Sequence, residues 1–181
     1  RLGSSSGLGE CPAEVPDQAG TLAGTPLQPL VKLVRDVTRR PLLAGNRVTP
    51  LVSGDQAYPA MLQAIDEAAR SITLSTYIFA HDSTGQRFLD ALRRAVSRGV
   101  EMRVLIDDVG ARYSWRPMPR VLRQAGIPCT QFLPTLIPWR FQYSNLRIHR
   151  KILVVDGRIG FTGGINIHAG NCLQRQPRHP V

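Results

Sequence analysis

The residues best suited to chemistry lie in one stretch near the end of the chain. An imidazole and an ammonium stand one residue apart there, and a carboxylate, two glycines and a short amide follow them. In order, these positions are His149, Lys151, Asp156, Gly163, Gly164 and Asn166.

These groups suit the chemistry of phosphate esters. Imidazole can act as a nucleophile or as a general acid–base, and an ammonium fixed beside it favours an anionic substrate, above all a phosphate. A carboxylate can orient a histidine, and glycines let backbone N–H groups approach a ligand. A single His-x-Lys pair would more simply be a polar strand end. The additional Asp, Gly-Gly and Asn favour phosphoryl transfer through histidine, with no metal or cofactor required.

The motif is predicted to form a β-hairpin. Residues 151–155 are apolar and β-branched, Asp156-Gly157 is a turn signal, and 158–162 resume the strand. Because side chains alternate along a strand, His149 and Lys151 should share one face. The hairpin would therefore hold the imidazole and the ammonium side by side at the lip of a hydrophobic strand.

Upstream of this hairpin, apolar runs alternate with amphipathic periods. Strands are predicted at 47–51, 71–79, 101–106 and 128–132, and helices at 58–69, 85–97 and 118–124. This alternation is typical of an α/β fold with a mostly parallel sheet covered by helices. Asp107 and Asp108 follow a strand, where α/β sites gather. They could equally cap a helix or turn, and the sequence leaves that choice open.

The chain before this domain has a different composition. Residues 1–29 are rich in Gly, Ser and Pro and are predicted to be a disordered leader or linker. Residues 30–45 form a helical lead-in, whose apolar stripe is expected to pack on the domain rather than on a membrane surface. Residues 46–181 form the domain that holds the motif.

The pattern H-x-K-x(4)-D-x(6)-G-G-x-N resembles the motif of the phospholipase D superfamily at every defining position. The neighbouring text at 76–79, 98–108, 145–157 and 163–167 is similar to the first half of a bacterial cardiolipin synthase. The resemblance covers about residues 41–181. It implies a phospholipase D-like mixed sheet flanked by helices. It also implies a second motif that faces the first. The given sequence contains only the first of the two motifs.

The resemblance also implies roles for the motif residues. His149 would attack the lipid phosphorus to form a phosphohistidine, and Lys151 and Asn166 would hold the phosphate together with the backbone of 163–164. Asp156 would orient a histidine, the one across the interface with the second motif. The acceptor would be the glycerol headgroup of phosphatidylglycerol, which yields cardiolipin. With water as the acceptor, the same site would be a phospholipase.

Three interpretations of the chain remain open. The first is a C-terminally truncated half of a two-motif enzyme, which the local text favours. A one-motif phosphodiesterase or nuclease would instead pair two copies of the chain. An inactive lipid-binding fragment is the third alternative.

Charge is distributed unevenly along the chain. Residues 1–108 hold 12 Lys+Arg and 12 Asp+Glu, whereas 109–181 hold 11 basic residues and one acid, so the net charge of +10 lies with the motif. Arg-rich coding would explain the preference for Arg over Lys but not the missing acids. Such a field attracts acidic lipid headgroups or, under the nuclease alternative, nucleic acid.

A second feature points to a membrane surface. Trp139, Arg140 and Phe141 lie in a Pro-broken aromatic loop, expected either at a membrane interface or packed within the protein. No apolar run approaches the roughly 20 residues of a membrane span. The expected location is therefore cytoplasmic and peripheral, at the inner membrane of a bacterium.

Overall fold

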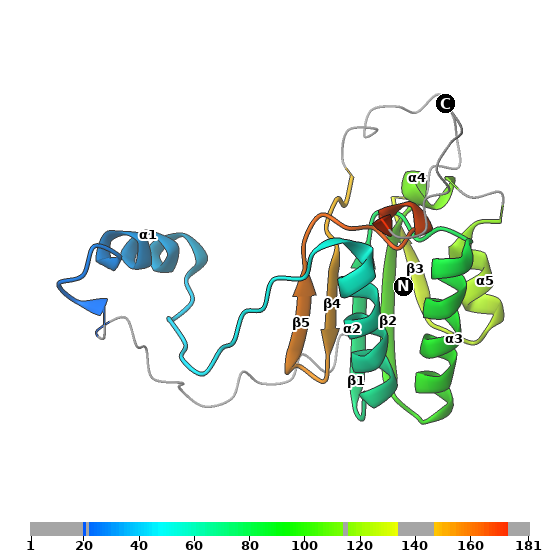
Figure 1. Ribbon diagram of the computed structural model, residues 1–181, viewed down its shortest axis with the longest axis horizontal. Helices are drawn as coiled ribbons and strands as arrows, with labels where there is room; N and C mark the ends of the chain where they lie inside the picture. The colour runs from blue at the N-terminus through cyan, green and yellow to red at the C-terminus, as the bar shows by residue number, and fades with distance from the viewer. Residues whose placement is uncertain (1–19, 21, 114–115, 134–146, 174–181) are drawn as a thin grey trace, which may run out of the picture. The chain divides into compact units, whose positions relative to one another are not determined.

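The computed structural model describes residues 20, 22–113, 116–133 and 147–173 (Figure 1). They belong to two compact units, one ending at Pro50 and the other beginning at Leu51. Among the described residues, no helix has the length and apolar character needed to cross a bilayer.

In its described residues, the first unit contains one α-helix, α1 (Gln28–Thr38). Its apolar residues repeat at helical spacing, yet none of its residues is buried. The packing of this helix on the domain stays a prediction. Residues 47–51, predicted as a strand, have no regular structure, and Val48 is 92% exposed. A β-branched run forms a strand only where another strand is available to pair with it.

The second unit is a five-stranded mixed sheet with helices packed against it. The strands are β1 (Ser71–Thr76), β2 (Glu101–Asp107), β3 (Cys129–Phe132), β4 (Ile152–Val155) and β5 (Ile159–Thr162). The helices are α2 (Ser53–Glu67), α3 (Ser83–Ser97), α4 (Asp108–Ala111), α5 (Met118–Gln124) and the 3₁₀ helix η3 (Ala169–Asn171). The predicted α/β fold with a mixed sheet is confirmed.

The strand order is β3-β2-β1-β4-β5. β1, β2 and β3 are parallel, whereas β4 runs antiparallel to both β1 and β5. Alternate residues of the central strands face a single core, and these are Ile72, Leu74, Met102, Val104, Ile106, Leu153 and Val155. Figure 1 shows α2 and α3 side by side over the sheet. The motif hairpin, formed by β4 and β5, is therefore part of the sheet, and β4 contributes residues to the core.

Two boundaries differ from those predicted. α2 begins at Ser53, so Pro59 lies inside the helix and not in its first turn. β1 ends at Thr76, and Phe79 forms only an isolated bridge with Ile167. The Asp82 carboxylate caps α3, because it accepts a hydrogen bond from the Gly85 N–H at 2.9 Å.

The topology brings several strand ends to one edge of the sheet. β1, β2 and β3 end there, β4 begins there and β5 ends there. Figure 1 shows this as the upper edge, with α4 and η3 beside it, and shows the β4–β5 turn at the lower edge. Ligand sites of α/β sheets gather at the carboxyl ends of the parallel strands.

Candidate active site

His149 and Lys151 lie at the edge of the sheet where β4 begins. The His149 ring lies 5.1 Å from the ring of Tyr77, centroid to centroid, with the planes tilted by 57°. Lys151 Nζ lies 5.5 Å from the centroid of the same tyrosine ring. The expected side-by-side placement is confirmed by these contacts, although both residues precede the first residue of β4.

Lys151 is buried although it carries a charge. It continues the inward-facing register of Leu153 and Val155, and only 8% of it is exposed. Its ammonium donates a hydrogen bond to the carbonyl oxygen of His149 at 3.0 Å. Within the described residues, no carboxylate forms an ion pair with it. Burial lowers the pKa of Lys151. A buried cation without a counter-charge favours binding of an anion.

Asn166 reaches the same edge after the chain leaves β5. Its Oδ1 accepts a hydrogen bond at 3.1 Å from the N–H of Ile78, the residue next to Tyr77. Its backbone carbonyl oxygen lies 2.6 Å from the Tyr58 hydroxyl and accepts a bond from Asn171 Nδ2 at 2.9 Å. Because Oδ1 is engaged, the amide offers its Nδ2 donor to a ligand.

Gly163 and Gly164 lie exposed between β5 and Asn166. A Cβ added to either glycine meets no atom within 4 Å, and neither has a positive φ. Nothing in the described part of the chain requires glycine at these positions. Their role in binding phosphate stays a prediction.

Asp156 lies at the opposite end of β4 from His149. Its carboxylate accepts hydrogen bonds from the N–H groups of Ala69, Arg70 and Ser71 at 2.9, 2.8 and 2.8 Å. The bond from Ala69, followed by those from Ser71 and Arg70, lowers the pKa of Asp156 to about 2.

This placement separates Asp156 from the histidine of its own chain. The predicted role, orienting a histidine across the interface with a second motif, stays a prediction. Seven residue-to-residue steps at strand spacing separate it from His149, which corresponds to roughly 20 Å. The three N–H groups already occupy its carboxylate. Asp156 therefore joins the β4–β5 turn to the start of β1 and does not orient the histidine of this chain.

Asp107 and Asp108 have structural partners. Asp107 is fully buried, and its Oδ1 accepts hydrogen bonds from the first turn of α4 while its Oδ2 accepts one from the Ile148 N–H at 3.0 Å. Asp108 pairs with Arg112 at 2.7 Å. The cap interpretation is confirmed for Asp107. In addition, Asp107 holds the backbone one residue before His149.

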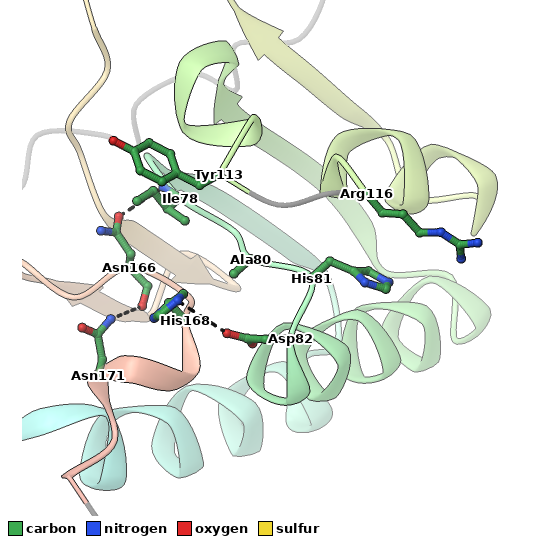
Figure 2. Close-up of a pocket in the computed structure, with 9 residues that line it drawn as sticks. All are labelled: Ile78, Ala80, His81, Asp82, Tyr113, Arg116, Asn166, His168 and Asn171. Atoms are coloured by element: carbon green, nitrogen blue, oxygen red, sulfur yellow. Dashed lines mark hydrogen bonds and ion pairs between the residues drawn. The ribbon is translucent and has the colours of Figure 1, made fainter. Parts of the chain in front are cut away.

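A cavity of about 620 Å³ opens beside Asn166 (Figure 2). It is lined by Ile78, Ala80, His81, Asp82, Tyr113, Arg116, Asn166, His168 and Asn171. Tyr113 also contacts Tyr77, with ring centroids 6.4 Å apart. The cavity therefore adjoins the tyrosine that His149 and Lys151 share. The Asp82 carboxylate is already engaged, by Gly85 N–H and by Ala169 N–H at 2.7 Å.

Two further predictions concern other parts of the chain. Within the described ranges, no group of three or more His, Cys, Asp or Glu side chains is placed to hold a metal ion. Trp139, Arg140 and Phe141, expected at a membrane interface, lie outside the described residues.

Tyr77 was not singled out from the sequence. It is the first residue beyond a buried strand, and such positions often carry function. The sequence does not show that β4 pairs with β1, and this pairing is what brings Tyr77 to the motif.

The assembled edge is suited to attack on a phosphate ester. It offers an exposed imidazole, a buried ammonium without a carboxylate partner in the described chain, and an oriented amide donor. These groups supply a nucleophile and positive charge where negative charge grows in a transition state.

Comparisons with known proteins identify a family for this chain. Residues 61–176 match the family described as "Cardiolipin synthase, PLD-like domain". The chain is 38% identical over 140 residues to cardiolipin synthase 1 of Bacillus anthracis, which covers 76% of the chain and 27% of that protein. It is 38% identical over 152 residues to cardiolipin synthase A of Pseudomonas aeruginosa, covering 83% and 31%. The chain thus spans less than a third of each relative.

Solved structures support the fold. Nuc from Salmonella typhimurium, a phospholipase D family member, superposes with a TM-score of 0.52 at 24% identity, over 67% of this chain and 73% of that one. NucT from Helicobacter pylori gives a TM-score of 0.50 at 19% identity, over 65% and 70%. At these identities the likeness concerns the fold alone.

Proposed function

Because the chain belongs to the PLD-like domain family of cardiolipin synthases, we propose that His149 and Lys151 form half of a phosphatidyl-transfer site. An imidazole nitrogen of His149 attacks the lipid phosphorus, and the bond between phosphorus and the leaving alcohol oxygen breaks. The product is a phosphatidyl group bonded to His149. A histidine from a second motif protonates the leaving alkoxide.

In the second step, an acceptor alcohol displaces His149 from phosphorus. The second histidine takes the proton of the acceptor hydroxyl. With the glycerol headgroup of one phosphatidylglycerol as acceptor and a second phosphatidylglycerol as donor, the products are cardiolipin and glycerol. The second motif comes either from further sequence or from a second copy of the chain.

The observation that carries this proposal is the state of Lys151. Its ammonium is buried, donates to the His149 carbonyl oxygen at 3.0 Å and forms no ion pair with a carboxylate in the described chain. A buried cation of this kind is costly for folding. A phosphate bound between Lys151 and Asn166 would compensate its charge and place phosphorus beside the imidazole.

The test is conversion of phosphatidylglycerol vesicles to cardiolipin and glycerol in the presence of EDTA, followed by mass spectrometry. It is run on this chain and on any longer protein that contains it with a second motif. We expect a phosphatidyl adduct on His149, trapped by rapid denaturation. His149→Ala should abolish adduct and product, while the exposed neighbour variant Arg150→Ala retains both. Loss of activity in EDTA, restored by a divalent ion, would overturn the histidine mechanism.

A second candidate is a one-motif phosphodiesterase or nuclease that completes its site by pairing two copies. The excess of 11 basic residues over one acid in residues 109–181 favours it, because the phosphate backbone of nucleic acid attracts such a surface. Cleavage of DNA by a dimeric chain, without conversion of lipid, would support this candidate. Binding to lipid without either reaction would identify a non-catalytic fragment.

A further inference from the structure

Tyr77 contacts both of the chemically active side chains, His149 and Lys151. It directly follows β1, and its ring contacts the His149 imidazole at 5.1 Å and the Lys151 ammonium at 5.5 Å, both measured to the ring centroid. The distance between the imidazole and the ammonium therefore depends on one ring that touches both.

An aromatic ring can stabilise the buried ammonium without neutralising it, whereas a carboxylate cannot. A carboxylate beside Lys151 would stabilise the buried ammonium but would also cancel the charge that a phosphate needs. The face of an aromatic ring attracts a cation through its quadrupole and carries no net charge. Tyr77 can therefore stabilise the ammonium and leave its full charge for an anion.

The same ring restrains the imidazole. His149 is exposed, and an exposed side chain samples several rotamers unless a neighbour limits them. A tilted aromatic contact at 5.1 Å is within the range in which ring pairs attract each other. The contact reduces the entropy that the nucleophile would lose on reaching its attacking position.

The position of Tyr77 is restrained by contacts with α4, with Tyr113 and, through the adjoining residue Ile78, with Asn166. A Cβ added to Gly110 in α4 would lie 1.8 Å from the Tyr77 carbonyl oxygen, so the helix packs directly against the Tyr77 backbone. The ring of Tyr113 contacts that of Tyr77 at 6.4 Å, and the adjoining residue Ile78 donates its N–H to Asn166. The backbone and ring of Tyr77 therefore have little freedom to move.

We infer that Tyr77 is a positioning residue that sets the spacing of His149 and Lys151 for a bound phosphate group through its aromatic face. This inference rests on the proposed function. It requires the ring and not the hydroxyl, because both contacts are made to the ring.

Two variants of the 181-residue chain separate ring from hydroxyl. Tyr77→Phe keeps the aromatic ring and removes the hydroxyl. Tyr77→Leu keeps the apolar volume but removes the aromatic ring. Phe161→Leu is the matched control, since it removes a ring that packs against the hydrophobic core from β5. Inorganic phosphate is the probe, and NMR follows the imidazole protons of His149 and the ε-methylene protons of Lys151. Thermal melts establish that each variant is folded.

We expect upfield ring-current shifts of the Lys151 protons in the wild type and in Tyr77→Phe, and their loss in Tyr77→Leu. Phosphate affinity should stay within about twofold in Tyr77→Phe and Phe161→Leu. It should fall roughly tenfold or more in Tyr77→Leu, the effect of losing a desolvated cation–π contact. In the complete enzyme, Tyr77→Leu should lower kcat more than it raises KM, which a purely structural role would not produce.

The outcomes distinguish the two proposals. Folded Tyr77→Leu that binds phosphate as the wild type does, with unchanged His149 shifts, would overturn the role of Tyr77 and leave the proposed function standing. A wild-type chain whose His149 and Lys151 signals do not respond to phosphate would overturn the phosphate site, and the inference with it.

Discussion

Asp107 accepts a hydrogen bond from the backbone N–H of Ile148 at 3.0 Å. The donor directly precedes His149, and the acceptor is a fully buried carboxylate at the end of β2. The other oxygen of the same carboxylate caps α4. One side chain therefore fixes both the start of a helix and the backbone that delivers the candidate nucleophile.

Asp107→Ala should destabilise the protein by about 1–3 kcal/mol, because it leaves a buried N–H without its acceptor and removes a helix cap. Asp107→Asn should cost less, since one carbonyl oxygen remains. Urea unfolding measures both. Asp66→Ala is the control, because Asp66 pairs with Arg94 at the surface and such pairs contribute at most about 1 kcal/mol. Equal losses for Asp107→Ala and Asp66→Ala would contradict the linking role.

Asp156→Asn should lower the melting temperature at neutral pH and should lower it less in acid. Its backbone hydrogen bonds depress the folded pKa to about 2 from the usual 3.8. The carboxylate therefore contributes stability above about pH 3.8, and this contribution is lost as pH falls towards 2. Thermal melts of wild type and variant from pH 7 to pH 2 should converge. A gap that is constant or widens in acid would exclude this linkage.

Lys151→Met should separate stability from activity. Methionine retains the apolar stem but removes a buried charge that lacks a carboxylate partner in the described chain. The free energy of unfolding should stay unchanged or rise, while phosphatidyl transfer falls by orders of magnitude. Urea titration and the cardiolipin assay measure the two effects. A strongly destabilised variant would mean that the ammonium is held for structure.

Alanine substitutions at three glycines should differ in their effect on the melting temperature. Gly163→Ala and Gly164→Ala place a Cβ in open space, so the melting temperature should barely change. Gly110→Ala places a Cβ 1.8 Å from the Tyr77 carbonyl oxygen and should destabilise strongly. If the 163–164 backbone binds phosphate, the first two variants should still lose activity. Full activity in both would remove these glycines from the phosphate site.

Vesicle binding should require anionic lipid and weaken with salt, because the basic excess lies in residues 109–181. Sedimentation with vesicles containing phosphatidylglycerol measures it. Arg120→Glu, exposed on α5, should weaken binding several-fold. Arg87→Glu on α3 makes the same charge change in the balanced part of the chain and should matter less. Equal binding to neutral vesicles at high salt would exclude the electrostatic attraction.

Local patterns in the sequence were sufficient to predict most elements. The alternating apolar periods placed α3, β2, α5 and β3 close to their observed bounds, and the turn signal at Asp156-Gly157 placed the β4–β5 hairpin. These features depend on neighbouring residues, through side-chain period and turn conformation. The strand predicted at 47–51 does not form, because this segment pairs with none of the strands in the described residues.

The site itself was only partly predictable. The sequence alone determined which residue types form the motif, and it determined that His149 and Lys151 share a side, because a two-residue period requires it. Only the tertiary structure decided that β4 pairs antiparallel with β1, residues about 80 positions apart. That pairing brings Tyr77 to the motif and carries Asp156 to the far edge. Strand pairing is set by the whole core, and no local pattern contains it.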